Sequence, residues 1–217
     1  MPRTANGRSV ETLIREGLWE DARALIEREL AGQPENHWLL THLGVTYYEQ
    51  QRYSDSLRPL LASLEIVPDC PLTLWNIAGA LGALGKPKEA IRIYTSLLRS
   101  DKTADDDSCW ESADWANALK ADCVYRIGCC FQRMKRRDSA ENCFRQYINL
   151  MLAGTVGTYT VEDAALRIGE LRTKGKRKLG REVKEAIGST LGDSGLQSIS
   201  GIGIGTPSLS AAEVLAR

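Results

Sequence analysis

The chain has 217 residues, which is enough to bury a sizeable hydrophobic core in one or two domains. Lys and Arg together number 28, and Asp and Glu also number 28, so the formal net charge is zero. A neutral chain has no overall attraction for nucleic acid or for anionic membranes. No apolar run reaches the roughly 18 residues of a membrane span, and the first residues lack the apolar core of a secretory signal. We therefore expect a cytoplasmic protein.

The N-terminal stretch predicts a short pair of helices within about residues 3–36. The segment VETLI after Ser9 can form a brief first helix, and LWEDARALI from Leu18 can form an amphipathic second one. We expect this pair to be degenerate, because the outer face of a terminal pair in a helical stack meets water.

Two further helix pairs, at residues 37–70 and 71–104, repeat with a period of 34 residues. Small residues recur at this step from the first pair to the third, and prolines, Pro34 and Pro68, stand at the turns that end the first two of these three pairs. In the first helices the small residues are Gly44 and Ala78, and in the second helices Ala22, Ser56 and Ala90.

A fourth pair, at residues 121–154, follows with Gly128 and Ala140 displaced by 50 residues instead of 34. An acidic insertion at about residues 101–118 accounts for the difference, and it contains Trp110 and Trp115. We expect a solvated loop followed by an N-terminal extension of the next helix, with the tryptophans covering apolar surface. A contact site for a basic partner is the alternative.

This register resembles the tetratricopeptide repeat family, whose unit is a helix–turn–helix of 34 residues. The residues of the second copy that carry the resemblance are Leu43, Gly44, Tyr47, Tyr53, Ser56, Leu60, Ser63 and Pro68. The resemblance implies an all-α fold, a right-handed superhelix of about three full repeats plus the degenerate first one, over residues 1–155. The small residues fit this fold, because larger side chains at a helix crossing would hold the two backbones apart.

Residues 156–187 predict a capping helix and a basic segment. Thr160 is a plausible helix N-terminus with acids on the first turn, and the helix after it would close the stack. Residues 172–184 then carry seven cations against one acid. A solvated helix face, a nucleic-acid or phosphate patch, and a partner for the acidic insertion all remain open.

The last segment, residues 188–217, is a Gly/Ser-rich arm. We expect a flexible arm with a short terminal helix, because Ser210 and Glu213 have capping-box spacing. Its scattered apolar residues could lie in a groove of the same chain or of a second copy, so self-association is a hypothesis.

The first helices of such repeats line a concave groove, which in this family binds extended peptides or partner helices. Counting from the small residue at each crossing gives the expected groove-facing residues. They are Trp38, Thr41, His42, Val45 and Tyr48 in the second copy, Leu72, Trp75, Asn76, Gly79 and Gly82 in the third, and Asp122, Tyr125, Arg126, Cys129 and Gln132 in the fourth.

The expected groove combines a recess with aromatic walls and two groups that can hold a peptide. Gly79 and Gly82 would form the recess, while Asn76 and Arg126 could bind an amide or a carboxylate. Packing between repeats is the alternative for Trp38 and Trp75. The carboxylate clamp with which some family members hold chaperone tails is broken here, since Thr41, Val45 and Asp122 replace three of its residues.

The six cysteines form no C-x-x-C pair, and only His37 and His42 could join them in a metal site. We expect most of them to be buried as small hydrophobes, with a metal or redox site as the alternative. The sequence contains no nucleophile motif and no phosphate loop, so we expect no cofactor and no enzymatic activity.

The favoured interpretation is an interaction module, an adaptor or a chaperone-like scaffold, that binds a peptide or partner segment in the groove. A nucleic-acid-associated protein that uses residues 172–184 is the alternative. Salt separates the two, because phosphate binding weakens steeply as salt rises.

Overall fold

The computed structural model describes residues 9–102 and 108–173 without interruption, together with residues 181 and 185. In this part of the chain all regular structure is helical, which confirms the all-α class. The helices are α1 (Val10–Arg15), α2 (Trp19–Gly32), α3 (His37–Glu49), α4 (Tyr53–Ile66), α5 (Pro71–Ala83), α6 (Pro87–Arg99), the 3-10 turn η1 (Ser108–Trp110), α7 (Ala113–Arg133) and α8 (Arg137–Leu152). Residues 161–173 are also helical.

Side-chain caps and prolines explain where several of these helices begin. The side chains of Ser9, Asn36 and Ser112 accept hydrogen bonds from backbone N–H groups in the first turns of α1, α3 and α7. Thr160 does the same for Asp163, as its sequence position predicted. Such caps satisfy donors that a helix start leaves without a partner. Pro71 and Pro87 occupy first-turn positions, where their missing N–H costs nothing.

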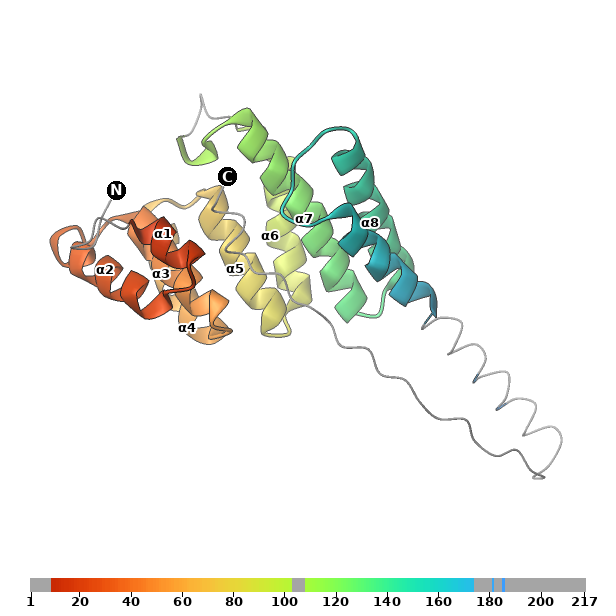
Figure 1. The fold of residues 1–217 in the computed structure, drawn as a ribbon, viewed down its shortest axis with the longest axis horizontal. Coiled ribbons are helices and arrows are strands. Elements are labelled where there is room, and N and C mark those ends of the chain that lie inside the picture. The colour runs from red at the N-terminus through yellow and green to blue at the C-terminus, as the bar shows by residue number, and fades with distance from the viewer. Residues whose placement is uncertain (1–8, 103–107, 174–180, 182–184, 186–217) are drawn as a thin grey trace.

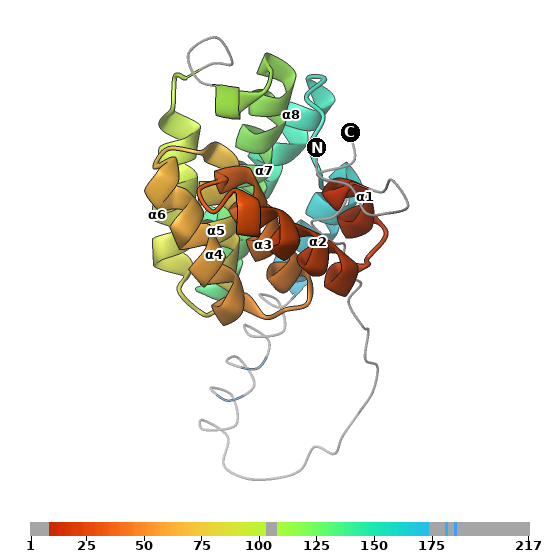
Figure 2. The same ribbon diagram turned by 90° about the vertical axis from the view of Figure 1, so that its left-hand side faces the viewer.

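Successive helices pack as antiparallel pairs that stack side by side from α1 to α8 (Figure 1). Each helix contacts the next one along the chain, and first helices also contact each other across the repeats, as α3 does α5 and α5 does α7. Figure 2 looks along this stack from its α1 end. The structure confirms the predicted architecture of stacked helix pairs.

The predicted small residues lie where two helices cross closely. A Cβ atom added to Gly44 would be 2.5 Å from Cγ of Leu60, and one added to Gly128 would be 2.9 Å from Cε1 of Phe144. The partner positions on the second helices are fully buried; these are Ala22, Ser56, Ala90 and Ala140. A larger side chain at these crossings would overpack the interface.

The acidic insertion is anchored by its first tryptophan. Trp110 is 1% exposed and belongs to the core shared by α5, α6 and α7, with Trp115 packed edge-on at 6.3 Å between ring centroids. Lys120 lies over the Trp110 ring and donates to the carbonyl of Ser100 at 2.7 Å. Helix α7 begins at Ala113, so the end of the insertion extends the next helix, as expected.

Helical residues 161–173 cover the α7–α8 end of the stack (Figure 1). Ala164, Ile168 and Leu171 are buried against apolar side chains of α7 and α8. Arg172 donates to Glu141 of α8 at 2.6 Å, a contact that lowers the pKa of Glu141. The predicted capping segment therefore closes the last repeat.

Several predictions fall outside the described residues: the start of the first pair before Ser9, most of the basic segment 172–184, and the arm at 188–217. Within the described part, no helix has the length and apolar character that crossing a bilayer requires.

Candidate functional site

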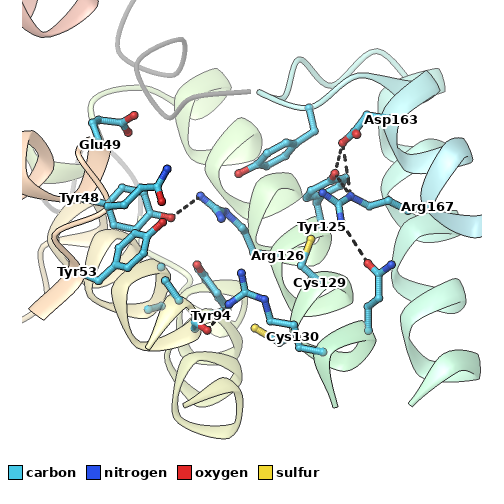
Figure 3. Close-up of a pocket in the computed structure, with 18 of the residues that line it drawn as sticks. Tyr48, Glu49, Tyr53, Tyr94, Tyr125, Arg126, Cys129, Cys130, Asp163 and Arg167 are labelled. Carbon is cyan, nitrogen blue, oxygen red and sulfur yellow. Dashed lines mark hydrogen bonds and ion pairs between the residues drawn. The ribbon is translucent and has the colours of Figure 1, made fainter. Parts of the chain in front are cut away.

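A cavity of about 680 Å³ opens among the first helices of the repeats (Figure 3). Helices α3 to α7 form most of it, and Tyr159 and helical residues 161–173 complete one side. Its lining is Tyr48, Glu49, Gln51, Tyr53, Ala78, Gly79, Gly82, Ala83, Tyr94, Tyr125, Arg126, Cys129, Cys130, Gln132, Arg133, Tyr159, Asp163, Arg167 and Glu170. Tyrosines and arginines dominate, which is typical of surfaces that bind other proteins.

Arg126 extends from α7 across this cavity toward Tyr48 of α3 (Figure 3). Its Nη2 donates to the Tyr48 hydroxyl at 3.2 Å. The guanidinium carbon lies 5.1 Å from the ring centre of Trp75 and 5.6 Å from that of Tyr159. Two aromatic rings therefore hold the cation in place, while its buried Nε has no hydrogen-bond partner among the residues that the structure describes.

Tyr159, from the loop after α8, forms one wall of the cavity. Its ring stacks on Tyr125 at 3.9 Å between centroids, with an angle of 8° between the ring planes. The Tyr147 hydroxyl donates to the Tyr159 carbonyl at 2.6 Å and accepts from the Tyr159 N–H at 3.0 Å. These contacts fix the loop against α7 and α8, so the wall is built before any partner arrives.

Asp122 anchors the same loop from inside α7. It is 2% exposed, and its Oδ1 accepts from the Thr158 N–H at 2.9 Å while Oδ2 accepts from the Thr158 hydroxyl. Burial raises the pKa of this carboxyl to about 6, although the Thr158 hydrogen bonds and the charge of Arg126 oppose that shift. Gly157 passes so close that an added Cβ would be 2.9 Å from Asp122 Oδ1.

A second polar group lies at the side of the cavity formed by residues 161–173 (Figure 3). The Tyr125 hydroxyl donates to Asp163, and Arg167 donates to both Tyr125 and Gln132, the latter at 3.2 Å. Arg167 also pairs with Asp163, with Nε and Oδ2 3.7 Å apart. This arginine is therefore already neutralised, unlike Arg126.

Seven of the groove residues expected from the sequence line the cavity together. They are Tyr48, Gly79, Gly82, Tyr125, Arg126, Cys129 and Gln132. Tyr48 packs over Gly79, where an added Cβ would be 3.2 Å from its ring. Whether these residues bind a partner stays a prediction.

The structure places the other expected residues of α3 inside the stack. Thr41 is 1% exposed and hydrogen-bonds Ser63 at 2.8 Å and Thr73 at 2.7 Å, between α3, α4 and α5. His42 is buried, which lowers its pKa, and stacks on the half-buried Trp38 at 3.8 Å. Val45 belongs to a core cluster with residues of α1 and α2. Thr41, His42 and Val45 therefore pack between repeats, whereas Trp38 keeps part of its surface exposed.

Trp75 and Asn76 of α5 are likewise interior, each 2% exposed. Trp75 belongs to the core that includes Tyr94 and Trp110. Packing between repeats was the alternative interpretation for this residue, and it agrees with this position. The Asn76 amide donates to the Leu72 carbonyl at 2.8 Å within the same helix. Trp75 still contributes to the cavity indirectly, because its ring supports Arg126.

Sequence reasoning missed the cavity residues that lie on second helices or after the last repeat. These are Tyr53, Tyr94, Tyr159, Asp163, Arg167 and Glu170. The repeat register points to first helices only, and Tyr159 lies outside the repeat period. The four-residue spacing of Asp163 and Arg167 is the one local sequence signal for these cavity residues, because residues four apart lie on the same face of a helix and can form an ion pair. Glu49, Cys130 and Arg133 lie on first helices but were not expected either.

Comparison with known proteins agrees with this geometry. Residues 122–150, which span most of α7 and α8, match the family model described as Tetratricopeptide repeat. This segment, the fourth helix pair, therefore carries the sequence pattern of a tetratricopeptide repeat. Arrays of this family are scaffolds for protein–protein interaction.

Two solved structures resemble the repeat array. A crystal structure of MamA protein shares 18% identity with a TM-score of 0.53, covering 87% of this chain and 94% of that one. A second crystal structure of MamA shares 16% identity with a TM-score of 0.49, covering 80% and 98%. At this low sequence identity, the similarity to the first of these structures is evidence for the fold alone. No curated protein sequence matches the chain.

Proposed function

We propose that this repeat array is a binding module, not an enzyme, that holds an extended segment of a partner protein in the cavity, with Arg126 as the anchor. The observation that supports this most is the state of Arg126, a cation held in the cavity by two aromatic rings. No ion pair among the described residues includes it.

The chemistry of Arg126 favours a carboxylate on the partner. A guanidinium offers donors in a planar fork that matches a carboxylate with two parallel hydrogen bonds. Of the other two arginines of the cavity, Arg167 pairs with Asp163 and Arg133 donates to the Gly82 carbonyl. Arg126 donates to the neutral Tyr48 hydroxyl and forms no ion pair among the described residues, so its charge can bind an Asp or Glu side chain or a chain terminus.

The walls of the cavity favour a side chain with an apolar surface next to that carboxylate. Tyr48 and Tyr53 pack edge-on at 5.2 Å, and Tyr94 comes from α6 of the next helix pair. Large aromatic rings contribute contact area at low entropic cost and are common in binding hot spots.

A peptide-display selection against the tag-free chain tests this function. We expect the selected peptides to share an acidic position, and the Arg126→Gln variant to bind them at least about tenfold more weakly. Arg92→Gln, an exposed arginine on α6, is the matched control and should bind as the wild type does. Equal affinity of wild type and Arg126→Gln for every selected peptide would exclude Arg126 as the anchor.

Nucleic-acid binding through residues 172–184 is the competing function, and salt distinguishes it. Of that segment, Arg172 is already paired with Glu141. The basic segment would carry the function if the Arg126→Gln variant still binds nucleic acid and its affinity falls by orders of magnitude between roughly 50 and 200 mM salt.

A further inference from the structure

Three side chains with metal-ligating atoms converge on the face of the array beside the acidic insertion. They are His37 at the start of α3, Cys70 directly before α5, and Cys109 in η1. One ligand atom of each lies within 4.8 Å of the other two. The residues are 33 and 39 positions apart in sequence, so no local motif brings them together.

Each of the three positions is held by contacts of its own. The Ser63 hydroxyl donates to the His37 carbonyl at 2.9 Å, and the Cys70 N–H donates to the Val67 carbonyl at 3.2 Å. Cys109 is adjacent to Trp110, which is buried in the core between α5 and α7. Lys102 also pairs with Asp69 at 3.0 Å, linking the start of the insertion to the turn that carries Cys70.

The donor set suits a soft divalent ion, and zinc in particular. Two thiolates and one imidazole are common zinc ligands, and around a tetrahedral ion such atoms lie about 3.4 to 3.8 Å apart. Small side-chain rotations would bring the three ligand atoms from within 4.8 Å to that spacing. Cys70 is 5% exposed and lies directly before the first residue of α5.

We propose that His37, Cys70 and Cys109 bind one Zn²⁺ ion, with water as the fourth ligand, and that the ion fastens the acidic insertion to the second and third repeats. On binding, both thiols lose their protons to solvent and two zinc–sulfur bonds form, with no change in oxidation state. The site is separate from the Arg126 cavity, so it can be tested without knowing the partner.

Metal analysis of tag-free protein, dialysed after incubation with zinc, tests the site. We expect about one zinc per chain in the wild type and in Cys143→Ser, a half-buried cysteine of α8 outside the site. Cys109→Ser and His37→Gln should retain little or none. A second readout is Co²⁺ substitution, which should give sulfur-to-cobalt charge-transfer absorption in the wild type and lose it in Cys109→Ser.

The proposal fails if the wild type retains no zinc, or if Cys70→Ser and Cys109→Ser retain as much as Cys143→Ser. Circular dichroism of each variant separates lost ligands from lost folding, and the exposed side of the site allows Cys109→Ser and His37→Gln to be tested even if Cys70→Ser does not fold. Two cysteines this close could instead form a disulfide, and thiol titration of the unfolded chain tests that alternative. Detection of four thiols in the wild type and of five in Cys109→Ser would indicate a Cys70–Cys109 disulfide and overturn the zinc site.

Discussion

Asp122 shows how one buried carboxylate shapes the wall of the cavity. Its two oxygens hold Thr158, and Thr158 precedes the tyrosine whose ring supports Arg126. The register of the fourth repeat placed Asp122 in the groove, but the structure buries it beneath the wall of the cavity. Its role is therefore positional, because it orders the loop and not the partner.

The raised pKa of Asp122 predicts a particular pH dependence of stability. An unfolded Asp titrates near about 3.9, whereas the folded value is about 6. Between these values the folded state binds more protons, so this residue destabilises the fold as pH rises through that window. We expect Asp122→Asn to gain stability over the wild type from about pH 4.5 to about pH 7, on the order of 1 to 3 kcal/mol.

Urea unfolding of both proteins at the two pH values measures this difference. Asparagine can keep both contacts with Thr158, since its oxygen accepts from the N–H and its amide donates to the hydroxyl. A difference in unfolding free energy that does not change with pH would show that Asp122 ionises normally in the folded state.

At the scale of elements, the helical segment 161–173 both covers the end of the stack and forms one wall of the cavity. It buries Ala164, Ile168 and Leu171 on one face and presents Asp163 and Arg167 to the cavity. Its opposite face is open, and Leu166 is 60% exposed. An amphipathic helix of this kind is stable because of tertiary packing more than because of helix propensity.

Two leucines of this segment provide a matched test of that packing. Leu171→Ala removes a side chain that is 6% exposed, and we expect a loss of about 2 to 5 kcal/mol. Leu166→Ala makes the same chemical change at the exposed position and should alter stability by less than about 0.5 kcal/mol. Thermal unfolding followed by circular dichroism compares them. Similar losses for the two variants would argue against this packing of the segment on α7 and α8.

At the scale of the whole molecule, a stack of repeats should be least protected at its N-terminal end. Helix α1 has 6 residues and packs mainly on α2, whereas α5 contacts α3, α4, α6, α7 and η1. In such arrays, local opening is easiest where a unit has a neighbour on one side only. Hydrogen exchange followed by mass spectrometry should show faster exchange in α1 than in α5 and α7. Uniform protection from α1 to α7 would indicate all-or-none opening.

Much of the fold was predictable because its signals are local. Gly44 and Gly128 lie at close crossings, as their register indicated, since a helix pair can approach closely only where side chains are small. The candidate site was predictable in part. Tyr48, Gly79 and Arg126 line the cavity as expected, but Thr41 and His42 are buried in contacts between repeats.

The sequence by itself determined the helix pairs, their period and the displaced fourth repeat, because amphipathic spacing and crossing residues are properties of neighbouring positions. Only the tertiary structure decided which first-helix side chains stay accessible, that Tyr159 and Arg167 complete the cavity, and that His37, Cys70 and Cys109 converge. The physical reason is that burial depends on what another segment places on top of a residue. For this protein those segments are the shortened helix α1, the insertion and residues 153–173, all of which depart from the regular repeat.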